Sequence, residues 1–418
     1  MEEAEKYACF VRKKEGTMIV RSKIGLWVIL LLAIFFLGQW LPATGQGQKP
    51  AWKGKIETEN GVKIVKNPTE PLHGELILEL EEDLSIGGNE NDDNYYFPKS
   101  VYIAVDDRGN IFTADTGNVR IQEYDKTGKH LRSIGRKGQG PGEFQFPGIV
   151  RFDGEGNISI IDSPTRALKV FSPDGTYKKS VPLRTFLQPN FYLSKEGFIF
   201  GLEINYMAKD GPRIAVVKLS PDGTSMETIA QFLGELKPNQ PAYALHVYTN
   251  FIALCGLSPT AFCYGFSASY KIFVADGQGK TSFVIEKEEN PQPITGKEKE
   301  FILKKGAGPM GGIARAKIEK IEDAAVFPPH RPYFGKVLAD DAGRIYITKR
   351  SSVLDQAKIQ ETDIFSKDGI YLYRAKIPFI PEVIKAGFMY EIWKNEETGD
   401  IMIARYKIKN WDQIKKGI

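Results

Sequence analysis

A repeat of about 48 residues constrains the fold of this chain more than any other feature of its sequence. Three short motifs occur twice at that spacing: Ser-Ile-Gly at 85–87 and 133–135, Phe-Pro at 97–98 and 146–147, and Gly-Asn at 109–110 and 156–157. Such a period is typical of propeller blades with four strands each. The Gly-rich stretch 133–147 lies inside the repeat and lacks the Lys-Ser/Thr pair and following helix of a phosphate-binding loop. We therefore expect it to connect two blades.

A hairpin signal recurs with nearly the same period. Five segments place Asp or Ser shortly before Gly, between two runs of apolar residues. Gly accepts a positive φ and Asp bonds its own backbone, so each segment predicts a tight hairpin turn. The five glycines are Gly128, Gly175, Gly223, Gly279 and Gly369. Five turns of this kind predict five blades.

The sixth blade is predicted to be shared between the two ends of the chain. Residues 386–408 have the pattern of inner strands and residues 75–87 that of an outer strand, with 75–82 expected to pair with 400–408. Closing a ring in this way leaves fewer exposed edges than an open stack. The sequence therefore predicts an all-β protein, a six-bladed β-propeller over residues 75–410, with seven blades as the rival count.

Residues 288–335 are long enough for a seventh blade but carry helical patterns. Residues 295–305 begin with a Thr-x-x-Glu capping box, and residues 311–323 place apolar side chains at helical spacing. We expect two short helices over one face of the ring. A helical insertion at about 291–330 then separates the fourth blade from the fifth.

The first 45 residues have the order of an export signal. Basic residues precede an almost wholly apolar run at 24–41, and small residues follow it. Two outcomes are open: a signal peptide cleaved after Gly45, with Met18 as a natural start, or an uncleaved membrane anchor. Both predict an exported protein, periplasmic or extracellular, tethered to the inner membrane in the second case. Residues 46–74 are expected to form an N-terminal extension with a hairpin.

One segment resembles a known repeat. "NIFTADTGNVRIQEYDKTGK" (110–129), followed by "GQGPGEFQFP", is similar to the NHL repeat. The wider pattern over about 60–408, strongest at 100–185, resembles the bacterial secreted 6-bladed β-propeller group related to NHL proteins. The resemblance implies a six-bladed ring. It also implies a structural turn role for Asp115 and Asn118, repeated from blade to blade.

The same segment holds the most conspicuous polar set, Asp115, Asn118 and Arg120. In a strand–turn–strand, the Asp and Asn side chains can bond the N–H groups of the turn. We expect Arg120 to pair with a carboxylate of a neighbouring blade or, if exposed on the rim, to hold an anion of a ligand. Asp162 and Arg166 form a degraded second copy.

His330 and Arg331 lie where the predicted insertion rejoins the ring. Two interpretations stay open: a packed connector with a solvated Arg, or a polar group beneath a lid. With Arg120 and Arg166 they form the candidate set of rim residues for a ligand.

No catalytic residue, metal ligand or cofactor site is predicted from local motifs. None of the four His is paired with another His or adjoins a Cys, so the usual zinc spacing is absent. "DDRGN" (106–110) and "DDAGR" (340–344) lack the further acidic ligands of a calcium loop and are expected to be turns. Residues distant in sequence can still converge in a ring channel, which leaves calcium or zinc open.

Cys255 and Cys263 lie in two apolar runs on either side of Ser258 and Pro259, a pattern typical of a hairpin. In an exported protein a cross-strand disulfide is one outcome. Two buried free thiols are the other.

The net charge of the chain and its predicted propeller fold are compatible with two classes of function. The formal net charge of +4 gives no electrostatic footprint for nucleic acid. The first class is a non-enzymatic exported scaffold that binds a protein, peptide or glycan through rim loops, with membrane contact only through residues 24–41 if these are retained. The second is a metal-dependent lyase or hydrolase, lactonase-like, acting in the central channel by analogy with other six-bladed propellers. The sequence favours the first class.

Overall fold

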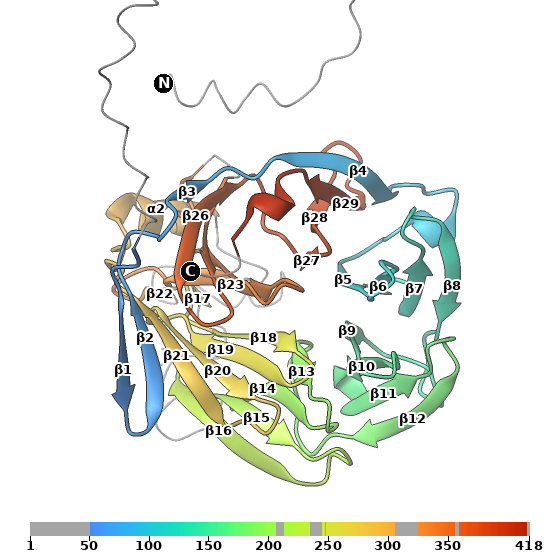
Figure 1. Ribbon diagram of the computed structural model, residues 1–418. Helices are drawn as coiled ribbons and strands as arrows, with labels where there is room; N and C mark the ends of the chain where they lie inside the picture. Colours follow the sequence, from blue (N-terminus) through green and yellow to red (C-terminus); the bar gives the residue numbers. More distant parts are fainter. Residues whose placement is uncertain are drawn as a thin grey trace, which may run out of the picture. The chain divides into compact units, whose positions relative to one another are not determined.

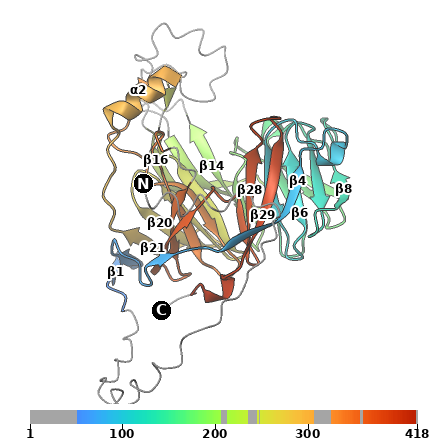
Figure 2. The ribbon, with the colours of Figure 1, turned by 90° about the horizontal axis from the view of Figure 1, so that it is seen from above.

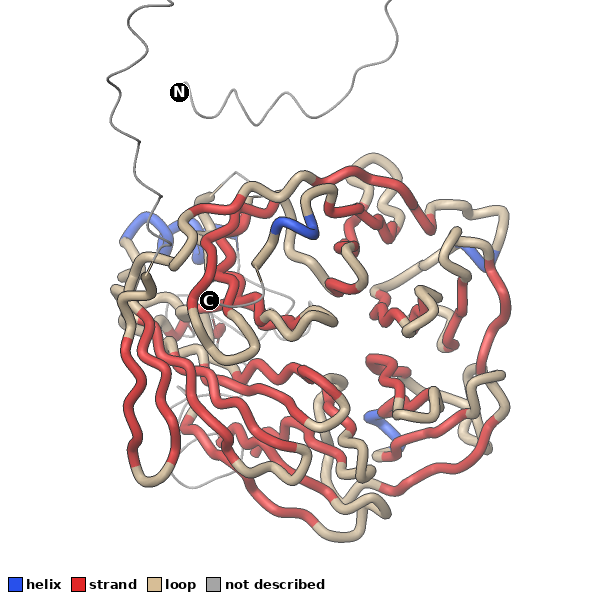
Figure 3. Tube along the Cα trace, in the orientation of Figure 1, coloured by secondary structure: helices blue, strands red, loops and turns tan. Residues whose placement is uncertain are grey.

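Six β-sheets are arranged as a ring around a central axis (Figures 1 and 3). The computed structural model describes residues 51–205, 213–234, 245–246, 248–305, 325–355 and 359–415. Each sheet contains a meander of antiparallel strands whose innermost member faces the axis. The prediction of an all-β, six-bladed propeller is confirmed, and the rival count of seven blades is wrong.

The first three blades each consist of four consecutive strands. The first holds β5 (Val101–Val105), β6 (Ile111–Asp115), β7 (Arg120–Tyr124) and β8 (His130–Ile134). The second holds β9 (Pro147–Phe152), β10 (Ile158–Asp162), β11 (Ala167–Phe171) and β12 (Tyr177–Pro182). The third holds β13 (Phe191–Leu193), β14 (Ile199–Asn205), β15 (Arg213–Leu219) and β16 (Met226–Leu233). The Gly-rich stretch joins β8 to β9 and is therefore a blade connector, as expected.

The last three blades each take strands from the N-terminal part of the chain. The fourth holds β18 (Ile252–Ser258), β19 (Ala261–Phe266), β20 (Lys271–Asp276) and β21 (Thr281–Lys287), with β2 (Val62–Asn67) and β1 (Lys55–Glu59) added outside. The fifth holds β23 (Phe334–Ala339), β24 (Ile345–Lys349), β25 (Gln360–Phe365) and β26 (Tyr371–Ile377), with β3 (Glu75–Leu76) added. The sixth holds β27 (Val383–Lys385), β28 (Phe388–Lys394), β29 (Ile401–Ile408) and β4 (Leu80–Gly87).

The five predicted hairpin glycines all occupy the turn between the third and fourth strands of a blade, with φ between 72° and 89°. In each turn the glycine N–H donates to the carbonyl three residues earlier, and a β-bulge shifts the register between the two strands that the turn joins. A type I turn followed by a left-handed residue matches the twist of the strands, and glycine adopts that conformation at least cost.

The ring closes where β4 pairs with β29 in antiparallel register, which places Ile86 opposite Ile403. Closure by the chain ends is confirmed, but of the expected residues 75–82 only 80–82 pair with β29, because the closing strand begins at Leu80. Residues Glu75–Leu76 instead pair in parallel with β26 of the fifth blade. The side chain of Asn410 bonds the backbone of Ile77 and Glu79, and so holds the segment as it passes from one blade to the next.

Apolar clusters fill the spaces between adjacent blades. Between the first and second blades, Phe112, Ile121, Phe144, Ile160 and Phe171 are almost fully buried together. Similar clusters join the other neighbouring pairs. Because each cluster takes side chains from two blades, the blades stabilise one another, as expected for repeat architectures.

The insertion between the fourth and fifth blades contains α2 (Gly296–Lys305), which lies on one face of the ring near its edge (Figures 1 and 2). The short strands β17 (Leu245–His246) and β22 (Ala325–Val326) pair in parallel. The second predicted helix, 311–323, and the predicted export segment lie outside the described residues. Within the described part of the chain, no helix is long and apolar enough to cross a bilayer.

Candidate functional site: the central channel

The innermost strands of the six blades line a central channel with a volume of 1240 Å³. Much of its wall is apolar. Lining side chains of this kind include Ile149, Leu193, Leu257, Leu338 and Val383. A concave apolar site with a few polar groups is the usual form of a ligand site in a protein.

Two of the basic side chains in the channel are neutralised by carboxylates. Lys336 Nζ lies 2.6 Å from Glu382 Oε2. Lys385 Nζ lies 2.6 Å from Asp107 Oδ1 at the mouth. These pairs add little net charge to the channel.

Arg151, on β9, differs from both lysines. Its Nε donates to the carbonyl of Phe191 (2.9 Å), one terminal nitrogen donates to the carbonyl of Val150 (3.1 Å), and the other donates to Asn190 Oδ1 (2.8 Å). All three acceptors are neutral, and among the described residues no carboxylate forms an ion pair with Arg151. Burial lowers the pKa of Arg151, but a guanidinium remains protonated at neutral pH. Arg151 is therefore a cation without an ion-pair partner among the described residues. The same channel is also lined by carboxylates, at Asp106, Asp107, Asp153, Glu155, Asp340, Asp341 and Glu382.

Cys255 lines the same channel, and Cys263 lies buried behind it. Both are free thiols in the structure. The hydrogen bond with Cys263 and the positive charges of Arg151 and Lys336 lower the pKa of Cys255. The same hydrogen bond and burial raise the pKa of Cys263.

The ring has two distinct rims. We call the end that carries residues 106–110, 153–157 and 340–344 the turn rim. We call the opposite end, with residues 115–120, 162–167 and the insertion, the connector rim. The definitions follow from the antiparallel order of the strands within each blade.

The two acidic loops of the turn rim are turns between the first and second strands, as expected. Asp106 Oδ1 accepts from the N–H groups of Arg108 and Asn110, and Asp340 Oδ1 accepts from those of Ala342 and Arg344. Their carboxylates are therefore engaged by backbone. In the part of the chain that the structure describes, no group of three or more His, Cys, Asp or Glu converges to hold a metal ion.

The polar set of the first blade forms a local turn on the connector rim. Asp115 Oδ1 accepts from the N–H groups of Gly117 and Asn118, both at 3.0 Å, and Asn118 Nδ2 donates to Asp115 Oδ2. Arg120 Nε lies 3.8 Å from Asp115 Oδ2, and its guanidinium donates to the carbonyl of Asp93. The expected partner in a neighbouring blade is therefore wrong, because Arg120 pairs with the carboxylate at the start of its own turn.

In the second blade the corresponding residues, Asp162 and Arg166, have different surroundings. Asp162 is buried, accepts from the N–H of Phe146 (2.8 Å) and lies 3.0 Å from Lys169 Nζ. It thus holds the blade connector. Arg166 is exposed on the connector rim in a left-handed conformation, with φ of 48°.

His330 and Arg331 lie at the foot of the insertion, partly buried. Arg331 Nε is 3.8 Å from Glu298 Oε1 of α2, and His330 Nδ1 contacts the Arg331 carbonyl at 3.2 Å. Arg331 therefore lies beneath the helix and is not a solvated side chain. Arg120 and Arg166 belong to the opposite side of the ring (Figure 1), so the four candidate rim residues do not form one cluster.

Glu298 fixes the helix to the ring. It accepts from the Thr295 N–H (2.9 Å), the Ser352 hydroxyl (2.8 Å) and the Tyr248 hydroxyl (2.8 Å). Burial alone would raise the pKa of Glu298, but these hydrogen bonds outweigh burial and lower the pKa to about 2.

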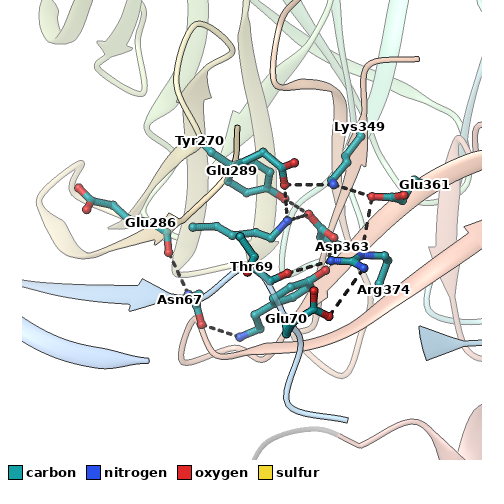
Figure 4. A network of polar contacts seen from close by, with 12 residues as sticks. Asn67, Thr69, Glu70, Tyr270, Glu286, Glu289, Lys349, Glu361, Asp363 and Arg374 are labelled. Atoms are coloured by element: carbon teal, nitrogen blue, oxygen red, sulfur yellow. Dashed lines mark hydrogen bonds and ion pairs between the residues drawn. The ribbon is translucent and has the colours of Figure 1, made fainter. Parts of the chain in front are cut away.

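A second polar cluster lies between the fourth and fifth blades, away from the channel (Figure 4). Lys287 Nζ lies 2.9 Å from Asp363 Oδ2, and both side chains are fully buried. The hydroxyls of Tyr270 and Tyr371 donate to the same carboxylate, at 2.6 and 2.5 Å. Because each of these four side chains has a hydrogen-bond or ion-pair partner, we interpret the cluster as a structural connection between the two blades.

Asn67, at the end of β2, attaches the N-terminal hairpin to this cluster. Its Nδ2 donates to the carbonyls of Glu286 (3.1 Å) and Gly369 (2.9 Å), and its Oδ1 accepts from the Tyr371 N–H (2.8 Å). One buried amide therefore links the hairpin to two blades.

The fold and the channel define the protein as a six-bladed β-propeller. Residues 99–234, which hold the first three blades, match the family DUF5128, described as a 6-bladed beta-propeller. The resemblance to a 6-bladed propeller family is thereby confirmed over this part of the chain. No curated protein matches the sequence.

Solved structures resemble this chain at low sequence identity. A protein of Bacteroides fragilis described as a candidate exported protein is 13% identical, with a TM-score of 0.49 over 83% of this chain and 99% of that chain. A duf4221 family member from Bacteroides vulgatus is 12% identical, with a TM-score of 0.49 over 79% and 98%. A gluconolactonase from Xanthomonas campestris is 10% identical, with a TM-score of 0.41 over 74% and 88%. A fold alone does not select a function, whereas the residues of the channel bear on it directly.

Proposed function

We propose that this protein is an exported, non-enzymatic binding scaffold whose channel receives the carboxylate of a peptide or protein ligand. Export is supported by the basic, apolar and small-residue order of the first 45 residues. The rim loops would contact the rest of the ligand, and the channel would hold its acidic group.

Arg151 carries this proposal. A guanidinium has five N–H donors, and three of them already bond neutral oxygens, which leaves two for a ligand. Arginine binds carboxylates through paired N–H groups, and the bond is strengthened where water is excluded. The apolar wall around it suits the aliphatic part of a chain end more than the hydroxyl groups of a sugar.

The test compares peptides that differ only in the negative charge of the C-terminal carboxylate. Immobilised peptides with free carboxyl ends and the same peptides with amidated ends are presented to the purified protein and to Arg151→Gln. We expect binding to the free ends, a loss of at least about tenfold on amidation, and the same loss in Arg151→Gln.

Arg166→Gln is the matched control, because Arg166 is an exposed Arg of the same blade and lies outside the channel. It should leave the affinity for free ends unchanged. Equal binding of free and amidated ends, or preference for glycans over both, would contradict the proposal.

A further inference from the structure

Two cysteines face each other across a pair of strands in the channel wall. Cys255 on β18 and Cys263 on β19 are direct partners in the antiparallel register. Directly opposite residues point to the same face of a sheet, with Cβ atoms about 4.5–5.5 Å apart. A disulfide needs about 3.5–4.5 Å between Cβ atoms, so a small movement is enough to join the two sulfurs.

The two thiols differ in access. Cys255 is partly exposed and lines the channel, whereas Cys263 is fully buried in the apolar cluster shared with the fifth blade. A small molecule in the channel can therefore meet Cys255 first. Cys263 can react only after Cys255 has done so, because Cys255 lies between it and the channel.

The charges around the pair favour the thiolate form of Cys255. The pKa of Cys255 is lowered by its hydrogen bond with Cys263 and then by Arg151 and Lys336, while the pKa of Cys263 is raised. Lys336 is already paired with Glu382, so Arg151 supplies the net positive charge. The thiolate is the reactive form of cysteine, and nearby cations are the usual cause of a reactive one.

We propose that Cys255 and Cys263 form a redox-active pair, in which Cys255 attacks a small-molecule disulfide in the channel and Cys263 completes the exchange. In the first step the Cys255 thiolate forms a bond to one sulfur of the disulfide. The S–S bond of the small molecule breaks, and one thiolate leaves. In the second step Cys263 loses its proton and attacks Cys255 Sγ, which expels the second thiolate.

The overall change is balanced. The protein dithiol loses two electrons and two protons and becomes a Cys255–Cys263 disulfide, and the small disulfide is reduced to two thiols. The exchange involves Cys255, Cys263 and the charge of Arg151, needs no peptide ligand, and goes beyond the proposed binding function. Failure of peptide binding would leave it intact.

The experiment uses the full chain, reduced, with Cys9→Ser to remove the third cysteine. The probe is dithiobis(nitrobenzoate), an aromatic disulfide that bears carboxylates. The native protein should release about two equivalents of coloured thiolate and lose about 2 Da, with the disulfide mapped to Cys255–Cys263 by peptide mass spectrometry.

Two single variants separate the roles. Cys263→Ser should release about one equivalent and retain the aromatic thiol as a mixed disulfide on Cys255. Cys255→Ser should react at least about tenfold more slowly, because the remaining thiol is buried. Circular dichroism checks that each variant is folded.

A different result overturns the proposal. If neither thiol of the native protein reacts until a denaturant is added, the pair is two inert core thiols. If Cys255→Ser reacts as fast as the parent, Cys255 is not the attacking group. Should a variant fail to fold, the reduced parent protein is treated with a limiting amount of iodoacetamide, and the labelling of Cys255 is compared with that of Cys263. Labelling of Cys255 at least about tenfold over Cys263 supports the proposal, and equal labelling contradicts it.

Discussion

Asp363 connects the fourth and fifth blades through a carboxylate that is fully buried. It accepts from Tyr270 and Tyr371 and pairs with Lys287, whose ammonium also lies 4.8 Å from the centroid of the Tyr371 ring. Removing one partner of a buried ion pair leaves the other charge uncompensated, which is costly. At the scale of single residues, the inter-blade contacts therefore depend on complete pairing.

Asp363→Asn should destabilise the protein by about 3 kcal/mol, because Lys287 loses its buried counter-charge. The measurement is equilibrium unfolding in urea. Asp107→Asn is the control, since Asp107 is almost fully exposed and its pair with Lys385 should contribute at most about 1 kcal/mol. Equal losses in the two variants would refute the structural role of the buried pair.

Glu298 should make stability depend on acid pH. Its folded pKa is about 2, below its usual value of 4.5. The ionised side chain therefore stabilises the fold above pH 4.5, and this contribution is lost as the pH falls from 4.5 towards 2. Unfolding of the protein and of Glu298→Gln across this window should show a shallower pH dependence in the variant. Parallel curves would mean that Glu298 is not held in its ionised form.

At the scale of elements, the turn between the third and fourth strands is the repeated unit of the ring. Gly223 shows why glycine is needed there, because an added Cβ would lie 2.0 Å from the carbonyl oxygen of Pro182 in the preceding blade. The turn is thus constrained both by its own positive φ and by its neighbour.

Gly223→Ala should therefore cost at least about 1 kcal/mol of unfolding free energy. Gly154→Ala is the control, because no atom lies within 4 Å of a Cβ at that position. Thermal unfolding of the two variants measures the difference. An equally stable Gly223→Ala variant would show that the backbone there can relax without cost.

Local chemistry explains which elements could be predicted from the sequence. The hairpin turns follow from Asp-to-Gly spacing, and the capping box of α2 follows from Thr295 and Glu298, whose mutual hydrogen bonds the structure contains. The register of closure could not be predicted in the same way. Leu76, Leu78 and Leu80 alternate like a strand, and only the tertiary contacts of Asn410 show that this segment crosses between blades.

At the scale of the whole molecule, the channel exists only when six innermost strands are assembled. Arg151, Asn190, Cys255 and Lys336 come from four different blades, and no local pattern joins them. The sequence offers one kind of signal, a basic residue inside the apolar run of an innermost strand, as at Arg151 and Lys336. Local motifs point instead to the candidate rim residues, two of which, Arg120 and Arg331, form structural ion pairs.

Ring closure should control the stability of the whole propeller. Ile86 on β4 is buried opposite Ile403, so Ile86→Ala should cost about 2–4 kcal/mol in a single cooperative transition. Ile77 lies on the same N-terminal segment but is 68% exposed, so Ile77→Ala should change stability by less than about 0.5 kcal/mol. Scanning calorimetry measures the stability of both variants. Similar losses of stability in the two would be evidence against ring closure by β4.

The central claim is that Arg151 makes the channel an acceptor for a carboxylate. The most direct measurement is a crystal structure of the protein soaked with bromobenzoate, which carries both a carboxylate and an anomalous scatterer. We expect the carboxylate within about 3 Å of the Arg151 guanidinium, with the bromine against the apolar wall, and no such density in Arg151→Gln. Bromobenzoate bound only outside the channel, or bound equally in the variant, would contradict the account.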